Sequence, residues 1–197
     1  GGGGGGGDNS ANAPSIGSGG SGIVALRYRT DPTSTDITGG TVFTPGDGNK
    51  YHVFTSNGTF HLGTAKPAME VLIVAGGGNG PHGTGSAVGG GGGGAGGFVT
   101  GSLSTPGITG ECAILVGDGG TADWNNAING ENSAFTINGS TFTANGGGAG
   151  GSYVGSGDES GNAGGSGGGV SYKPQAPPNG AGGGASPTGS TQTPQPS

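Results

Sequence analysis

The residues that could carry out catalysis or hold a cofactor are few, and none stands in the setting that its chemistry needs. Residues 164–168 read Gly-Gly-Ser-Gly-Gly, which matches the G-x-S-x-G pattern of a hydrolase nucleophile. That serine needs a strand-to-helix turn with a histidine and an acid as partners, and here it lies in polyglycine. Residues 17–22 read Gly-Ser-Gly-Gly-Ser-Gly, a G-x-G-x-x-G match that precedes a predicted strand instead of following one. No lysine stands in a P-loop motif. We therefore predict no catalytic residue, no cofactor and no enzymatic activity.

The side chains that could bind a metal ion also lack a ligand pattern. A β-hairpin with its turn at Asn57-Gly58 would put His52 and His61 on one sheet face as diagonal neighbours. Two histidines are too few for a zinc site, which uses three or four ligands. Carboxylates in the glycine-rich loops lack the regular spacing of calcium-binding loops. They are Asp118, Asp123, Asp158 and Glu159. The sequence predicts no metal site and leaves calcium binding undecided.

Glycine dominates the composition: 57 of the 197 residues are Gly, and only 8% are charged. Disordered chains usually carry many charges, so the low charge favours an ordered protein in which backbone hydrogen bonds offset the entropy that glycine loses on folding. Collagen needs Gly at every third position, and the runs at 1–7 and 89–94 have no such period. Unbroken glycine instead predicts extended three-fold helices of the polyproline II type, which bond side by side because no Cβ keeps them apart.

Charge, hydropathy and cysteine content exclude several classes of protein. The formal net charge is −6, with only 5 Lys and Arg residues, which argues against a nucleic-acid partner because such proteins need a basic face. No stretch of about 18 apolar residues occurs, so no membrane span is predicted. The single cysteine, Cys112, excludes an internal disulfide.

Short apolar runs separated by glycine predict an all-β fold: a small β-sandwich of short strands combined with polyglycine II-type helices, with no α-helix. Strands are expected at 23–29, 70–75, 98–103 and 111–116. In the first of them, alternation puts Val24, Leu26 and Tyr28 on one face. The runs 70–75 and 111–116 are continuously apolar, and we interpret them as strands buried on both faces.

An Asn-Gly pair between two strand-like runs is the strongest short signal for a β-hairpin, because a type I′ turn needs positive φ at both positions. Asn57-Gly58 is expected to join 50–56 to 59–62, with Thr55 opposite Phe60.

A second pair, Asn138-Gly139, is expected to join 134–137 to 140–143, with Phe135 opposite Phe142. Both pairs are followed by Thr or Ser, so both also match the N-glycosylation acceptor. The turn accounts for each pair without a sugar, and glycosylation stays undecided.

Several short motifs follow one another in a fixed order. Residues 51–60 read Tyr-His-Val-Phe-Thr-Ser-Asn-Gly-Thr-Phe, and 71–78 read Val-Leu-Ile-Val-Ala-Gly-Gly-Gly. After a long glycine run come Ile-Leu-Val-Gly-Asp-Gly-Gly at 114–120 and Gly-Glu-Asn-Ser-Ala-Phe at 130–135. In order and wording this resembles the glycine-rich domains of phage tail fibres and of large bacterial surface proteins, over residues 40–169.

In that family the domain usually closes with a segment like 19–28, which here stands before the opening hairpin. The resemblance therefore implies a circularly permuted order, which fits either one period of a tandem array or a strand that completes the sheet of a neighbouring subunit. In the second case Ile23, Val24, Leu26 and Tyr28 form the assembly strand. Both arrangements run head to tail and can continue as a filament.

These arguments divide the chain into three parts. Residues 1–30 are a glycine run and the closing strand of a preceding repeat, or a donated strand; 31–170 are the glycine-rich β domain; 171–197 are a Pro/Gly/Ser/Thr linker. The expected function is a structural subunit or repeat of an extracellular filament whose partners are copies of itself.

The resemblance adds an alternative function, a phage tail-fibre or adhesin domain that binds a cell-surface glycan or protein. Aromatic side chains with a polar tip would contact that ligand in the alternative, and would otherwise pack over the glycine helices. They are Tyr28, Tyr51, Trp124, Tyr153 and Tyr172.

Overall fold

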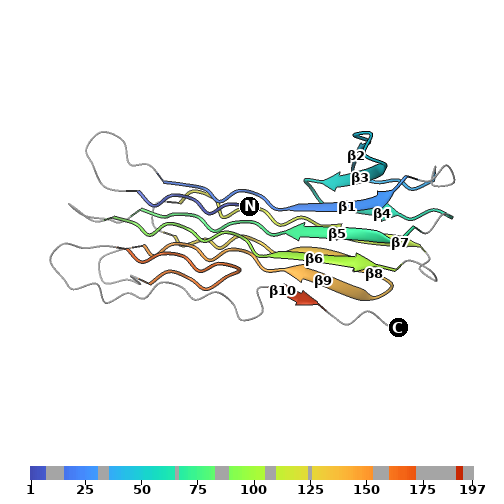
Figure 1. Ribbon diagram of the computed structural model, residues 1–197. Helices are drawn as coiled ribbons and strands as arrows, with labels where there is room; N and C mark the ends of the chain where they lie inside the picture. Colours follow the sequence, from blue (N-terminus) through green and yellow to red (C-terminus); the bar gives the residue numbers. More distant parts are fainter. Residues whose placement is uncertain are drawn as a thin grey trace.

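Runs rich in Val, Ile, Phe and Thr form the strands, and glycine-rich runs form extended segments that continue those strands along the long axis of the molecule (Figure 1). The computed structural model describes residues 1–7, 16–30, 36–64, 67–82, 89–104, 110–123, 126–152, 160–171 and 190–192. In these residues every regular element is a strand and no helix occurs, which confirms the predicted all-β class.

The strands form two antiparallel five-stranded sheets. In chain order they are β1 (Ile23–Arg29), β2 (Thr41–Phe43), β3 (Asn49–Phe54), β4 (Gly58–His61), β5 (Met69–Val74), β6 (Phe98–Leu103), β7 (Glu111–Leu115), β8 (Ser133–Ile137), β9 (Ser140–Ala144) and β10 (Ser190–Gln192). The first sheet has the order β2-β3-β1-β5-β6, and the second has the order β10-β9-β8-β7-β4.

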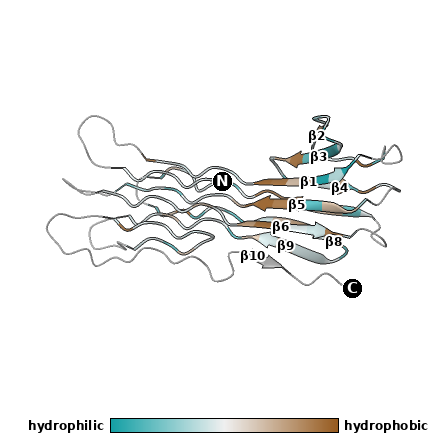
Figure 2. Ribbon diagram, viewed as in Figure 1, coloured by the Kyte–Doolittle hydropathy of each residue, from teal (hydrophilic) through white to brown (hydrophobic). Residues whose placement is uncertain are grey.

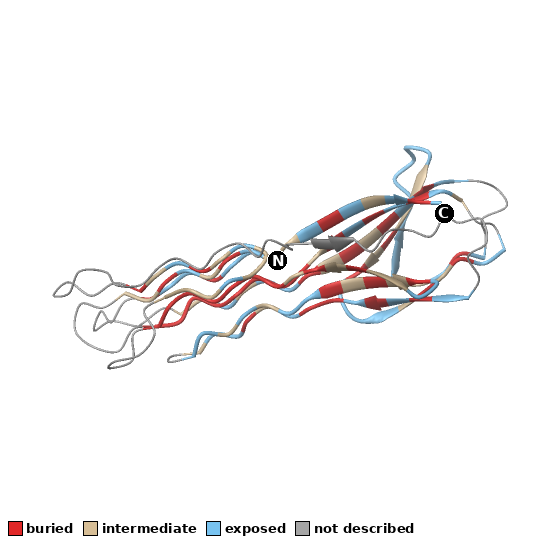
Figure 3. Cartoon of the chain, turned by 90° about the horizontal axis from the view of Figure 1, so that it is seen from below, coloured by how far each residue is buried: buried red, intermediate tan, exposed pale blue. Residues whose placement is uncertain are grey.

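The sheets pack face to face around an apolar core. Buried residues alternate with less buried ones along β1 and β5 (Figure 3), and the inward face of β1 carries Val24, Leu26 and Tyr28, as predicted. The second sheet contributes the fully buried rings of Phe60 and Phe135. Figure 2 shows that the most hydrophobic stretches lie on β1, β5 and β6, whereas the glycine half has no comparable apolar cluster.

The prediction that two strands are buried on both faces was wrong. Burial alternates along β5 and β7, so that Leu72 is 38% exposed and Leu115 is 46% exposed. A continuous apolar run is typical of strands that are covered on both faces. Here the outward residues of these antiparallel strands instead make parts of the outer sheet faces apolar.

The hairpin predicted at Asn57-Gly58 was also wrong. β3 pairs with β1 and β2, whereas β4 pairs with β7 in the other sheet. The chain therefore crosses between sheets at Asn57, whose side-chain oxygen accepts a hydrogen bond from the Val116 N–H at 2.8 Å. His52 and His61 consequently lie in different sheets and do not share a face, which overturns the predicted pair.

The hairpin at Asn138-Gly139 is confirmed. Asn138 has a φ of 46° and Gly139 a φ of 74°, the positive values that a type I′ turn needs. β8 and β9 pair in the predicted register, with Phe135 opposite Phe142 and their ring centroids 6.3 Å apart.

β1 lies at the centre of the first sheet, between β3 and β5 of the same chain. Residues 16–22 lead into it, and residues 1–7 run beside the extended segment that follows β5. The described residues of 1–30 are thus packed into the same body as the rest of the domain. Within the predicted linker 171–197, β10 pairs with β9.

A polar pair is buried in the sandwich core between the sheets. Nδ1 of His52 lies 2.7 Å from the Gly39 carbonyl oxygen, and Nε2 of His52 lies 3.1 Å from the Tyr28 hydroxyl oxygen. A carbonyl can only accept, so Nδ1 carries the proton and Nε2 accepts from Tyr28. Burial raises the pKa of Tyr28 to about 12 and lowers the pKa of His52 below its usual 6.5, which keeps both groups neutral at pH 7.

This pair predicts a pH dependence of stability. Because the pKa of His52 is lower in the folded chain than in the unfolded chain, its contribution to stability is fully present above about pH 6.5 and is lost as the pH falls from there toward the folded-state pKa. Denaturant unfolding should therefore show that the free energy of unfolding decreases as the pH is lowered from 7 to 5. His52→Gln should make this decrease smaller. His61→Gln, at a half-exposed position, is the control and should retain the slope. An unchanged slope in His52→Gln would contradict this assignment.

Candidate functional site

The segment 75–82 is the centre of a hydrogen-bonded lattice of extended chains. Its N–H groups bond to three neighbouring segments, and residues three apart bond to the same one. Ala75 and Gly78 donate to Gly97 and Gly94, Gly76 and Asn79 donate to Glu131 and Ile128, and Gly77 and Gly80 donate to Gly20 and Gly17. A repeat of three residues in bonding direction is the signature of a three-fold extended helix.

The carbonyl groups of this segment face three further segments. Gly147 and Gly150 donate to the carbonyls of Gly76 and Asn79, Gly120 donates to Gly77, and Gly4 donates to Gly78. Donor and acceptor directions therefore lead to six surrounding segments, the arrangement of a hexagonal lattice. The segment 75–82 is buried along its whole length, and its peptide N–H groups from Ala75 to Gly80 are all satisfied by neighbours, as buried backbone requires.

The lattice requires glycine at most of its interior positions because the neighbouring backbones occupy the space of a side chain. A Cβ atom on Gly76 would lie 2.0 Å from the Asp118 carbonyl oxygen, one on Gly77 2.1 Å from that of Gly2, and one on Gly78 2.3 Å from that of Gly148. The three directions of the helix are thus all closed. In the edge segment 1–7, by contrast, a Cβ atom on Gly2 or Gly5 would meet nothing within 4 Å.

Asn79 is a polar side chain buried at the centre of the lattice, beside the facing ends of two neighbouring segments. It is fully buried, and its amide nitrogen donates to the carbonyls of Thr121 and Asn126 at 2.9 Å each. Its amide oxygen accepts from the Ile128 N–H at 2.8 Å. One carboxamide therefore links the end of the segment 116–123 to the start of the segment 126–132.

Two asparagine side chains take the place of a missing neighbour of the segment 145–152. Asn132 accepts from the Gly146 N–H at 2.8 Å and Asn129 accepts from the Ala149 N–H at 2.9 Å. Gly146 and Ala149 are three residues apart, so their N–H groups point in the same lattice direction, and both residues are buried. The two carboxamides, also three residues apart, thus stand where the carbonyls of another helix would stand.

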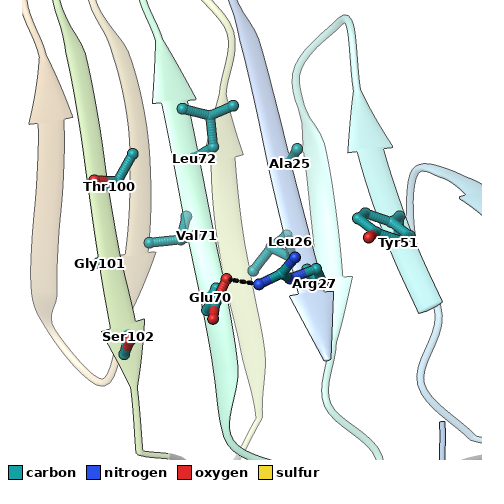
Figure 4. Close-up of a pocket in the computed structure, with 10 residues that line it drawn as sticks. All are labelled: Ala25, Leu26, Arg27, Tyr51, Glu70, Val71, Leu72, Thr100, Gly101 and Ser102. Atoms are coloured by element: carbon teal, nitrogen blue, oxygen red, sulfur yellow. Dashed lines mark hydrogen bonds and ion pairs between the residues drawn. The ribbon is translucent and has the colours of Figure 1, made fainter. Parts of the chain in front are cut away.

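The outer face of the first sheet carries a shallow groove of about 490 Å³ (Figure 4). Arg27 and Glu70, directly opposite each other on β1 and β5, form an exposed ion pair across it, with Tyr51 on the β3 side and Leu72 further along β5. A hydrogen bond that Arg27 donates to the Tyr51 hydroxyl oxygen and the charge of Glu70 raise the pKa of Arg27. The groove thus combines an aromatic ring, a charged pair and an apolar floor.

The structure brings few of the predicted site residues together. The inward residues Val24, Leu26 and Tyr28 of β1 belong to the sandwich core. Ser166, the centre of the hydrolase-like motif, is a lattice residue whose N–H donates to Ala95 and whose carbonyl accepts from Gly148. Other predicted residues lie outside the described residues: Trp124, Tyr153, Asp158, Glu159 and Tyr172.

The asparagines of the lattice and the groove of the first sheet were not predicted from the sequence. A usable signal for the first was present, because Asn129 and Asn132 share the three-residue spacing of the helices. In the part of the chain that the structure describes, no three or more His, Cys, Asp or Glu side chains gather as metal ligands. The same residues include no helix that is long and apolar enough to cross a membrane.

The lattice predicts a large loss of stability for one glycine substitution and almost no change for another. Gly77→Ala should force a Cβ atom against the Gly2 carbonyl and lower the free energy of unfolding by about 3 kcal/mol, because the helices must separate. Gly2→Ala should change it by no more than about 0.5 kcal/mol, since its Cβ atom meets open space. Denaturant titration followed by circular dichroism measures both. Equal losses in the two variants would contradict the lattice.

The asparagine pair predicts a dependence on the side-chain acceptor. Asn132→Ala should leave the buried Gly146 N–H unsatisfied and cost about 1–3 kcal/mol of stability, with faster hydrogen exchange at that amide. Asn132→Asp keeps an acceptor oxygen at an exposed position and should retain most of the stability and the protection. Exchange at Gly146 that is equally slow in the alanine variant would show that Asn132 does not cap this direction.

Comparison with known proteins identifies a family for most of the chain. A family model described as a glycine-rich domain matches residues 55–197. The match includes β4 to β10 and most of the lattice, and it leaves β1, β2 and β3 outside. Neither the curated proteins nor the solved structures contain a match to this chain. Since the matched region covers most of its length, the chain belongs to the glycine-rich domain family.

Proposed function

We propose that this chain is a structural subunit or repeat of an extracellular glycine-rich filament, assembled head to tail. The observation that carries the proposal is the continuity of strands and lattice. The segments 75–82, 116–123 and 145–152 follow β5, β7 and β9 directly, and 16–22, 89–97 and 126–132 lead directly into β1, β6 and β8.

This continuity suits a mechanical role. The backbone hydrogen bonds lie across the long axis in both halves of the molecule. A pull along the axis would therefore load many of these bonds together in shear. A rod of this kind transmits force without a catalytic centre or a bound cofactor.

Head-to-tail assembly would use β1. Its pairing with β3 and β5 can be made by the same chain or by a neighbouring copy that supplies an identical strand, as in β-strand addition. A covalent tandem array is the other way to continue the rod.

A cysteine pair tests which chain supplies β1. Arg27 and Glu70 are exposed and directly opposite, so Arg27→Cys with Glu70→Cys should form a disulfide whichever chain provides the strand. Strand exchange predicts a ladder of oligomers on denaturing, non-reducing gels, and the ladder should collapse to one band on reduction. Cys112 is buried, and each single variant is the control for unintended pairing.

Monomers alone on that gel would exclude exchange through β1. In that case native material of several times 18.1 kDa under denaturing conditions would indicate a covalent array. Single chains with no filaments in the electron microscope would exclude the proposal in both forms.

The groove of the first sheet favours the second candidate, a phage tail-fibre or adhesin domain that binds a surface glycan or protein. Tyr51 offers a ring with a polar tip beside the Arg27–Glu70 pair, a combination that suits the apolar and hydroxyl faces of a sugar. Filaments seen without virions would count against this alternative.

A further inference from the structure

The lattice has two faces of different character. One, here named the bare face, is formed by the segments 1–7, 89–97 and 165–171, which bond side by side in one row. Its exposed residues are Gly2, Gly3, Gly5, Gly6, Gly92, Ala95, Ser166 and Gly169. The described residues of this face contain no titratable side chain.

Two of the six directions around the segment 89–97 have no hydrogen-bonded neighbour among the described residues, and both lie on the bare face. Residues 90, 93 and 96 donate to the segment 1–7, and residues 91, 94 and 97 donate to 145–152. Within the described residues, no partner accepts from the third set of N–H groups, those of Gly92 and Ala95. Likewise no described residue donates to the carbonyls of 90, 93 and 96. A row of N–H groups without a described acceptor therefore runs beside a row of carbonyl groups without a described donor.

The segment 1–7 borders the same groove of the lattice. Its Gly4 N–H bonds inward to Gly78, whereas the exposed Gly2, Gly3, Gly5 and Gly6 have no described backbone acceptor for their N–H groups. A three-fold helix lying between 1–7 and 89–97 would meet N–H groups on one side and carbonyls on the other, repeated every ~9 Å. This is the pattern that surrounds 75–82 inside the molecule.

The opposite face is closed against such a neighbour. Its segments 116–123 and 126–132 point polar side chains outward, with Asp118, Thr121 and Glu131 exposed. Where a helix is missing there, Asn129 and Asn132 occupy the open direction. The chain thus caps one side of its lattice with polar side chains, whereas the exposed described residues of the other side are glycines and the small residues Ala95 and Ser166.

We propose that the bare face binds the bare face of a second copy of this chain, extending the hexagonal lattice from one molecule into the next. The occupant must be a side-chain-free extended helix with unused donors and acceptors three residues apart, and the same face of another copy supplies it. The carboxylates of the described residues lie away from the bare face, so they place no like charges in this contact. The contact is lateral and isologous, and it stands independently of head-to-tail assembly.

Two substitutions test the proposal in the full chain. Gly5→Glu with Gly92→Glu puts carboxylates on the bare face at positions where a Cβ atom meets nothing closer than 3.7 Å, so the fold should be retained. Like charges would then oppose each other across the contact, and the dissociation constant of the lateral dimer should rise about tenfold or more. Sedimentation velocity measures the dimer, and the width of bundles in the electron microscope measures lateral packing where filaments form.

The control places the same charge on the capped face, as Thr121→Glu with Ala127→Glu at exposed positions. This variant should associate like the unaltered chain. Gly5→Lys with Gly92→Lys, mixed with the glutamate variant, should restore association through opposite charges.

Three results would overturn the proposal. They are a chain that stays single at millimolar concentration, glutamate variants that associate unchanged, and a capped-face control that dissociates equally. Slow hydrogen exchange of the Gly92 and Ala95 amides in the single chain would also overturn it, because another part of the same chain would then fill the groove. Head-to-tail assembly is read separately, from filament length and the cysteine ladder.

Discussion

The lateral N–H···O=C bond between glycine helices is the interaction on which the structure depends. Each helix around 75–82 turns its peptide groups outward in directions that alternate between donor and acceptor, so a fully bonded interior is a hexagonal array. Helices that approach closely enough to form these bonds leave little space for a Cβ atom, and the described residues of this half therefore form no hydrophobic core of their own. Its large cost in glycine entropy is offset by its bonds and by the sandwich, because most of its segments are continuous with a strand that the apolar core holds in place.

The sequence predicts that extended glycine helices pack together, but it does not predict how they are arranged. The three-residue period is weak in the interior segments because glycine is needed at most positions there. It is clearer where a segment lies at an edge and one position in three is free. Ser18 and Ser21, Asp118 and Thr121, and Asn129 and Asn132 are such pairs. Polyglycine packing could thus be inferred from composition, but the order of the rows depends on contacts between segments far apart in the chain.

The two Asn-Gly pairs show how far a local signal reaches. At Asn138 both flanking runs belong to the second sheet, so the intrinsic preference of the turn and the tertiary structure agree. At Asn57 the same dipeptide connects strands of opposite sheets, and the side chain bonds to Val116 instead of closing a turn. The error for β5 and β7 has a similar origin, because the exposure of Leu72 and Leu115 depends on what covers the outer faces of the sheets.

The position of β1 couples the two halves of the molecule. The segment 16–22 that leads into β1 is itself bonded to 75–82 and 116–123, and through Gly20 to the segment 1–7. A copy that supplied β1 to a neighbour would therefore also supply lattice helices. The junction would combine a central strand, buried apolar side chains and a set of lateral backbone bonds, and these could form only together. Such a junction would be cooperative, because a subunit could not release the strand without also opening the lattice beside it.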